Sequence, residues 1–365
     1  MRYHKYLKNT SNLGGLTVAH RFLMKEIALQ AGLGLATVDR VLNGREHVRE
    51  HTRQRVQHAI KELEKQQFQL ATSGRKLVVD VVVEAPRRFS DEIREALESE
   101  LPGLQPAVFR PRFLMQDMMT TAQVVDALEA IGRRGSHGVL LKARDVPAVA
   151  GAVADLQQRG IPVVTIFTDI AQSARIAYAG LDNRMAGATA AYLIAQWLAR
   201  REGDVLVTMS HERFRGEEER ERSFRDELLR QSPKLKLVDA SGGQGLDAQT
   251  EERVKRAVGS GRKIVAVYSM GGGNVAILRA LRSMGQTPKC FIGHDLDRDN
   301  VELLREGKLS AVLHHDLRQD MRTACHYIMH FHKLLPASAV GLSSSVVVVT
   351  PANIPQSVEQ RFGNR

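Results

Sequence analysis

Residues 24–44 read MKEIALQAGLGLATVDRVLNG, two short helical patterns separated by a glycine-containing turn at 32–34. Apolar side chains fall on one face of each pattern: Ile27, Ala28 and Ala31 on the first, Val38, Val41 and Leu42 on the second. Burying these faces leaves Thr37, Arg40 and Asn43 directed outward. Small residues at the crossing and a second helix that fits a DNA major groove are what a helix-turn-helix requires. The stretch therefore predicts a DNA-binding element.

A third helical pattern follows over about 50–67 and supplies Val56, Ile60 and Leu63 to close a small core. Its first turn carries side chains suited to phosphate contacts: Arg49, Thr52, Arg53 and Arg55. The positive charge is concentrated here as well. Residues 1–76 hold 14 lysines and arginines against 6 acidic residues, whereas the other residues hold 38 against 35. A basic module on a nearly neutral body indicates a polyanion partner for the module; a basic solvated tail is the alternative.

From about Leu77 the pattern changes to apolar, β-rich runs such as LVVDVVVE, IPVVTIF and KIVAVYSM, alternating with helical segments. Continuous Val/Ile/Leu runs indicate strands buried on both faces, as in parallel sheets with crossover helices. About ten such runs lie between Leu77 and Thr350, more than one open sheet usually holds. We therefore expect α/β architecture with two doubly wound parallel-sheet lobes behind a small all-α three-helix head. A ligand is expected between the lobes, at the carboxyl ends of the strands.

Composition excludes several classes of protein. Hydrophobic residues are 43% and charged residues 25%, as in globular domains. No apolar run reaches the ~18 residues of a membrane span, and residues 1–20 lack the apolar centre of a signal peptide. Two cysteines, Cys290 and Cys325, are too few for a disulfide framework. We expect a cytoplasmic, nucleoid-associated protein with no membrane partner.

The spacing EIALQAGLGLATVDRVLNG, followed by TRQRVQHAIKEL, closely resembles the headpiece of LacI/GalR transcription regulators over about residues 21–64. The lobes look like the effector domain of that family, which shares its fold with periplasmic sugar-binding proteins. The resemblance implies an extension at 1–20, a headpiece at 21–67, a linker or shortened hinge at 68–76 and an effector domain at 77–356. Its N-lobe would hold about 77–180 and 316–340, and its C-lobe about 181–313 and 341–356. The extension would be a disordered basic arm or the result of an early start codon.

By the same resemblance, Leu35, Ala36 and Arg40 read bases. Arg40 can reach guanine O6 and N7 with two hydrogen bonds, worth about 1–3 kcal/mol of discrimination. Asp39 either accepts a hydrogen bond from cytosine N4 or holds Arg40 in position. Leu23 and Gly34 replace the hydroxyl caps common at these helix starts. The expected DNA contacts are Leu35, Ala36, Thr37, Asp39, Arg40, Asn43, Arg49, Thr52, Arg53 and Leu70.

The linker departs from the family. Members usually carry a short hinge helix whose leucines enter the minor groove, but here Leu63 and Leu70 are only seven residues apart. About one helical turn is missing. Leu70 remains the candidate wedge.

The resemblance also implies a set of effector contacts at strand ends. Phe89 is the natural stacking platform beside Arg88, Asp169 an acceptor for hydroxyls, and Arg220 a guanidinium that chelates ligand oxygens. Asp295 matches a carboxylate that binds two adjacent hydroxyls, and His315 a polar position after the next strand. Ser269, Met270 and Asn274 border the glycine-rich YSMGGGNVA segment. A phosphorylated sugar held by Arg88, Arg220 and the glycine amides is the alternative to a neutral sugar or polyol.

No catalytic arrangement, metal signature or cofactor motif emerges. The sequence thus predicts a sequence-specific DNA-binding regulator, most often a repressor in such families, controlled by a small polar effector. A homodimer on a near-palindromic operator is expected, with a tetramer left open. The rival interpretations are a sugar-binding or solute-sensing protein without a DNA role and a sugar-acting α/β enzyme.

Overall fold

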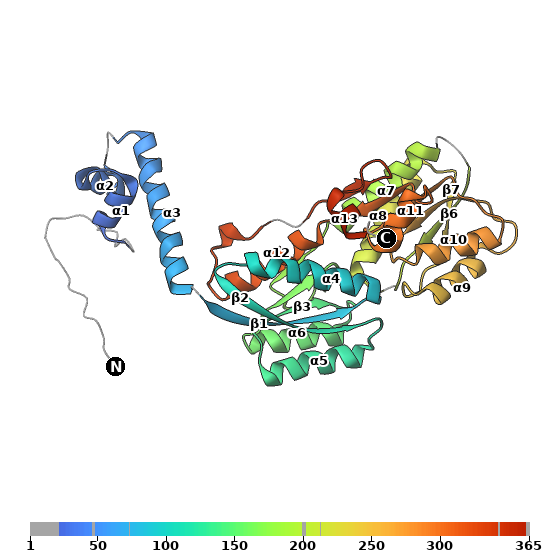
Figure 1. The fold of residues 1–365 in the computed structure, drawn as a ribbon, viewed down its shortest axis with the longest axis horizontal. Helices are drawn as coiled ribbons and strands as arrows, with labels where there is room; N and C mark the ends of the chain where they lie inside the picture. Colours follow the sequence, from blue (N-terminus) through green and yellow to red (C-terminus); the bar gives the residue numbers. More distant parts are fainter. Residues whose placement is uncertain are drawn as a thin grey trace. The chain divides into compact units, whose positions relative to one another are not determined.

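The computed structural model describes residues 22–45, 48–72, 74–198, 202–211, 213–341 and 344–362. The chain divides into two compact units, residues 1–73 and 74–365 (Figure 1). None of the described helices is both long enough and apolar enough to span a bilayer.

The first unit is built from α1 (Met24–Ala31), α2 (Leu35–Leu42) and α3 (Glu50–Thr72). Gly32 ends α1 with φ of 60°, the left-handed conformation that lets the chain turn sharply into α2. The predicted apolar faces form the core: Ile27, Ala28, Val38 and Val56 are buried, with Val41, Leu42, Ile60 and Leu63 packed around them. The helix-turn-helix prediction is confirmed.

The helix starts are weakly capped, as the sequence indicates. Neither Leu23 nor Gly34 offers a side-chain cap, although the Glu26 carboxylate accepts a hydrogen bond from the Leu23 amide at 2.9 Å. At its other end, α3 differs from the prediction. It continues without a break to Thr72, and β1 begins at Arg75, so helix occupies most of the stretch expected to be a linker at 68–76.

The N-lobe of the second unit is a parallel sheet of order β2-β1-β3-β4-β5. Its strands are β1 (Arg75–Glu84), β2 (Ala107–Gln116), β3 (Gly138–Lys142), β4 (Val163–Ile166) and β5 (Ala177–Ala179). The helices α4 (Arg87–Glu100) and α12 (Leu317–Phe331) cover one face (Figure 1). On the other face lie α5 (Thr121–Arg134) and α6 (Pro147–Gln158).

The C-lobe sheet has the order β11-β10-β9-β8-β6-β7, with β11 antiparallel. Its strands are β6 (Gly203–Thr208), β7 (Leu235–Asp239), β8 (Ile264–Ser269), β9 (Cys290–His294), β10 (Ala311–His314) and β11 (Val347–Val349). One face packs on α7 (Asn183–Leu198) and α8 (Arg215–Gln231). The other packs on α9 (Asp247–Val258), α10 (Asn274–Ser283), α11 (Arg298–Arg305) and α13 (Gln356–Phe362).

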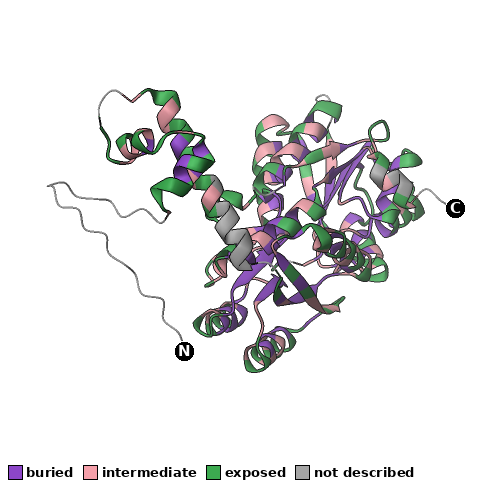
Figure 2. Ribbon diagram, turned by 60° about the vertical axis from the view of Figure 1, so that its left-hand side comes forward, coloured by how far each residue is buried: buried purple, intermediate pink, exposed green. Residues whose placement is uncertain are grey.

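Burial follows these layers. Central strands such as β3, β4, β8 and β9 are buried along their whole length, whereas most helices show one buried and one exposed side (Figure 2). Two doubly wound lobes therefore exist as predicted. The chain passes between them after β5, after β10 and before β11, so residues on the connecting segments lie next to both lobes.

Candidate functional site

The outward face of α2 carries the predicted base-reading side chains. Leu35, Ala36 and Arg40 are exposed, and Thr37 is half-buried. The side chain of Arg40 makes no hydrogen bond or ion pair with any described residue, so its guanidinium is available to a partner. An exposed arginine on the second helix of such a motif can reach base edges in the major groove.

Asp39 does not hold Arg40. Its carboxylate accepts a hydrogen bond from the Asn43 side chain at 2.7 Å and lies 3.3 Å from Nη2 of Arg45. Position explains the difference, because Asn43 lies one turn away on the same helix face while Arg40 projects about 100° round from Asp39. Asp39 and Asn43 thus restrain one another at the C-terminal end of α2.

The start of α3 presents a second polar group. Arg49 is exposed and its carbonyl oxygen accepts the first hydrogen bonds of the helix, from Thr52 and Arg53. Arg53 also donates from Nε to the Val48 carbonyl at 3.4 Å. The backbone of Leu70 lies within α3, but its side chain is outside the described residues, so its predicted role as a wedge stays a prediction.

A cavity lies between the two lobes and encloses about 70 Å³. Since one water needs roughly 10–15 Å³ by this measure, the space suits a small molecule. Its walls come from the carboxyl ends of strands and the helices that follow them: Arg88, Phe89, Lys142, Phe167, Thr168, Phe214, Glu217, Arg220, Met270, Gly271, Gly272, His294, Asp295, Asp297 and His315. Six of the predicted effector residues are among them.

Two non-glycine residues of the wall have left-handed backbone: Phe167 with φ of 61° after β4, and Asp295 with φ of 64° after β9. Such residues cost of order 1 kcal/mol or more and gather at ligand sites, where the fold enforces them. Here the conformation aims both side chains at the cavity. Phe167 packs edge-on against Phe89, with ring centroids 5.5 Å apart, and against His315 at 5.6 Å.

Asp295 belongs to a buried chain of charges. Nε2 of His315 lies 3.4 Å from Oδ1 of Asp295, and Nδ1 of His315 lies 2.6 Å from Oδ2 of Asp320. Burial by itself would lower the pKa of His315, but hydrogen bonding and attraction to the two carboxylates outweigh it and raise the pKa to about 9. Burial acts to raise the pKa of Asp295, yet His315 and Arg220 hold it well below its usual range. Asp295 is therefore an ionised acceptor at the cavity wall.

Arg220 opposes Asp295 as the principal donor. Its Nε donates to the Asn183 side chain at 2.7 Å and its Nη1 to the Met270 carbonyl at 3.3 Å. Both partners are neutral, so the charge of Arg220 remains available to a ligand. The α7–α8 crossing that places Arg220 depends on Gly187, where an added Cβ would lie 2.1 Å from the Arg220 carbonyl oxygen.

Arg88 reaches across from the N-lobe to the C-lobe. Its Nε lies 3.2 Å from Oδ2 of Asp297, the residue that caps α11 through the Asn300 amide at 2.8 Å. Burial raises the pKa of Asp297 to about 6 although Asn300 and Arg88 both oppose the shift. Gly272 allows this contact because a Cβ there would lie 2.3 Å from Nη2 of Arg88.

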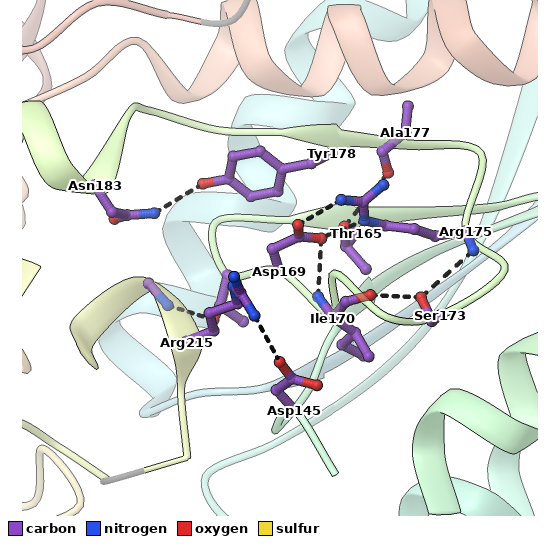
Figure 3. A network of polar contacts seen from close by, with 12 residues as sticks. Asp145, Thr165, Asp169, Ile170, Ser173, Arg175, Ala177, Tyr178, Asn183 and Arg215 are labelled. Carbon is purple, nitrogen blue, oxygen red and sulfur yellow. Dashed lines mark hydrogen bonds and ion pairs between the residues drawn. The ribbon is translucent and has the colours of Figure 1, made fainter. Parts of the chain in front are cut away.

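Three predicted effector residues do not line the cavity. Asp169 forms a two-point ion pair with Arg175 and accepts a hydrogen bond from Thr165 at 2.7 Å (Figure 3). The left-handed backbone at Phe167 changes the direction of the chain, so Phe167 and Thr168 occupy the place expected for Asp169. The Ser269 hydroxyl turns to the Gly272 carbonyl, and Asn274 donates to Asn300 at 2.7 Å.

Sequence reasoning also missed residues that the cavity uses. Lys142 ends β3. Glu217 lies in the first turn of α8, where its carboxylate accepts hydrogen bonds from the Ser210 amide and hydroxyl. His294 donates or accepts at Nε2 with the Tyr268 hydroxyl at 2.8 Å, while its buried Nδ1 has no hydrogen-bond partner among the described residues. The sequence did offer a signal for Lys142 and His294, because each is a polar residue at the end of an apolar strand, in GVLLK and FIGH.

A polar network near the segment that follows β5 also joins the two lobes (Figure 3). Arg215 of α8 lies 3.4 Å from Asp145 of the N-lobe. Asn183, which holds Arg220, also donates to the Tyr178 hydroxyl at 3.2 Å, and Tyr178 donates to the Leu181 carbonyl in the connecting segment. The cavity arginine is thus linked to the segment about which the lobes meet.

Two family profiles match the sequence. "Bacterial regulatory proteins, lacI family" matches residues 23–64, and "Periplasmic binding protein domain" matches residues 115–330. This combination of head and binding domain decides the assignment. The chain belongs to the LacI/GalR family. A LacI/GalR member with these two parts is a DNA-binding, sugar-responsive regulator and not an enzyme.

Solved structures resemble this LacI/GalR protein over its second unit. GanP, a glucose-galactose binding protein from Geobacillus stearothermophilus, aligns with a TM-score of 0.68 and 17% identity, covering 78% of this chain and 99% of that one. An Agrobacterium vitis transporter solute binding protein with bound D-fucose aligns at 0.67 and 21%, covering 79% and 99%. A Bacillus halodurans protein with bound myo-inositol aligns at 0.65 and 18%, covering 80% and 98%. These likenesses show the fold. A search of curated proteins gave no match.

The described part of this LacI/GalR chain has neither a candidate metal site nor a reactive thiol. No group of three or more His, Cys, Asp or Glu side chains there could hold a metal ion. Cys290 and Cys325 are buried and unpaired, and burial raises the pKa of Cys290 to about 12 and that of Cys325 further. Both thiols are therefore protonated at neutral pH.

Proposed function

We propose that this regulator is a repressor that binds a near-palindromic operator as a homodimer at the nucleoid, and that a small sugar or polyol in the inter-lobe cavity changes its operator affinity. The proposal rests on the combination of two features in one chain. The same chain presents an unpaired Arg40 on an exposed recognition helix and an ionised Asp295 in a cavity between two lobes.

The charges of the cavity support a neutral polyhydroxylated ligand over a phosphorylated one. Asp297 pairs with Arg88, and Asp295 with His315. Arg220 and Lys142 keep positive charges without an ion-pair partner, but Asp320 and Glu217 bring one negative charge each to the same region, so the charges balance. A carboxylate next to a guanidinium satisfies adjacent hydroxyls as acceptor and donor. Relatives in the fold bind D-fucose and myo-inositol, and this chain is proposed to bind a ligand of that class.

The contacts across the cavity support control of operator affinity. Arg88 to Asp297, Arg215 to Asp145 and the Gly216 amide to the Thr168 hydroxyl at 3.0 Å all join the N-lobe to the C-lobe. A ligand held by residues of both lobes would favour this closed arrangement. If operator DNA favours one lobe arrangement, each ligand changes the affinity of the other by the same factor, typically about 5- to 150-fold.

Two measurements test the proposal with the full chain. Selection from random duplexes should enrich a sequence with two related half-sites about 34–36 Å apart. A thermal-shift screen of sugars, polyols and sugar phosphates should give a hit that moves operator binding, measured by fluorescence anisotropy. Failure to enrich any sequence would leave a solute-sensing protein without a DNA role. Turnover of the hit compound would instead favour an enzyme.

A further inference from the structure

Lys142 stands apart from the other lysines of the described residues because it is the only one that is buried. It closes β3 and its side chain reaches the cavity wall. Nζ donates one hydrogen bond to the Glu84 carbonyl at 2.9 Å and lies 3.9 Å from the centre of the Phe214 ring. It has no carboxylate within ion-pairing distance among the described residues. A structural lysine would normally have one.

The surroundings of Lys142 favour loss of its proton. Burial lowers the pKa of this amine to about 8, and the charge of Arg220 adds to the effect. Glu217, Glu84 and Asp295 oppose it at longer range. About one amine in ten is then neutral at pH 7, whereas an ordinary lysine of pKa ~10.4 has roughly one in 2,500. A desolvated lysine beside an aromatic ring in a cavity is the arrangement of imine-forming lysines.

The groups around Nζ match the needs of a carbonyl ligand. Arg220 and buried His294 line the same cavity; Arg220 can donate to ligand oxygens, and Nδ1 of His294 has no hydrogen-bond partner among the described residues. The Phe214 ring covers one side of the amine, and because a ring face attracts an ammonium it opposes the effect of burial in part. By the same measure, the volume of about 70 Å³ has room for roughly five to seven waters, which suits a ligand the size of a small sugar.

We propose that Lys142 captures a carbonyl compound, an aldehyde or the open-chain form of a reducing sugar, as a reversible imine within the cavity. This inference rests on the proposed function because it assigns the chemical class of the effector at that same site. It makes the amine a specificity-determining group that selects carbonyl-bearing ligands over polyols of the same size.

The step balances without an oxidant or reductant. The Nζ lone pair attacks the carbonyl carbon, the electrons of the C=O π bond move to oxygen, and a nitrogen-bound proton transfers to that oxygen. The resulting carbinolamine loses its hydroxyl as water, with the remaining nitrogen-bound proton ending on the departing oxygen, while the nitrogen lone pair forms the C=N bond. One water leaves for each imine formed. Hydrolysis reverses the step, as an effector that must be released requires.

Reductive trapping of the full-length wild-type protein tests the proposal. Glycolaldehyde or glyceraldehyde is added with cyanoborohydride, which delivers hydride to the imine carbon and leaves a stable secondary amine. Peptide mass spectrometry then compares Lys142 with Lys255, a surface lysine paired with Glu251. We expect the initial rate at Lys142 to exceed that at Lys255 by at least about tenfold at pH 7. The rate at Lys142 should level off above pH 8.

Lys142→Met and Lys142→Arg should lose the preferential adduct, whereas Lys255→Arg should keep it. Mapping on the wild-type chain does not depend on how these variants fold. Equal labelling of both lysines, or a Lys142 profile still rising near pH 10, overturns the imine. A thermal-shift panel with glycerol and myo-inositol separates the two proposals. Polyol binding without trapping would remove only the imine, and absence of all sugar, polyol and operator binding would remove the proposed function itself.

Discussion

The Asp295–His315–Asp320 chain gives the sharpest prediction. Asp320 is fully buried, lies 2.6 Å from His315 and also accepts a hydrogen bond from the Ser344 amide at 3.1 Å. Replacing it in Asp320→Asn keeps the size and one acceptor oxygen but removes the charge. The imidazolium of His315 then keeps only Asp295, at 3.4 Å, as a counter-charge. Breaking a buried pair typically costs about 3–5 kcal/mol, which is the loss expected at pH 6.5.

The loss should depend on pH with a defined sign. The folded pKa of His315, about 9, lies above the unfolded value near 6.5, so its charge stabilises the fold below pH 6.5. This stabilisation, about 3 kcal/mol, disappears as pH rises through 9. Lys142 acts in the opposite sense, because its lowered pKa makes the fold more stable as pH rises above 8. The difference between wild type and variant cancels the Lys142 contribution and isolates His315.

Urea denaturation followed by circular dichroism between pH 6 and 9.5 would measure this difference. A single transition at 222 nm and in near-ultraviolet signals is required before free energies are compared. We expect the destabilisation by Asp320→Asn to shrink by about 2–3 kcal/mol from pH 6.5 to pH 9.5. Parallel curves for the two proteins would show that His315 is neutral in the native state, and the charged-chain argument would be refuted.

Three further results are expected. Arg40→Ala should lower the discrimination between operator and mismatched duplex by about 1–3 kcal/mol at unchanged melting temperature. Arg133→Ala removes an equal charge from α5 and should leave the discrimination unchanged. A footprint in which Arg40→Ala discriminates as well as the wild type would contradict this prediction. Operator affinity measured by anisotropy should fall by roughly 10³-fold or more between about 50 and 200 mM salt, and a flat response would argue against phosphate contacts. Gly187→Ala should cost about 1–3 kcal/mol in a thermal melt through the 2.1 Å clash with Arg220, whereas Gly151→Ala, on α6 with open space around it, should be neutral or stabilising.

The two lobes could be predicted because buried parallel strands have a distinctive composition. Runs such as LVVDVVVE bury both faces and have no polar alternation, which excludes an exposed sheet. The head was predictable for a related reason, since the spacing of Ile27, Val38 and Val56 specifies which faces meet. The end of α3 was not. The polar stretch before Gly74 reads as a linker, but its residues have adequate helix propensity and extend a helix already nucleated by the core.

The candidate site divides along similar lines. The sequence by itself determined that polar side chains at the ends of apolar strands, among them Asp295 and His315, gather where parallel strands end. Only the tertiary structure decided which of them face the cavity. The left-handed backbone at Phe167 turns Asp169 away to Arg175, and the side chains packed around the amine of Lys142 include Phe214, 72 residues later in the chain. Strand composition is a local property, whereas side-chain direction and desolvation depend on packing between residues distant in sequence.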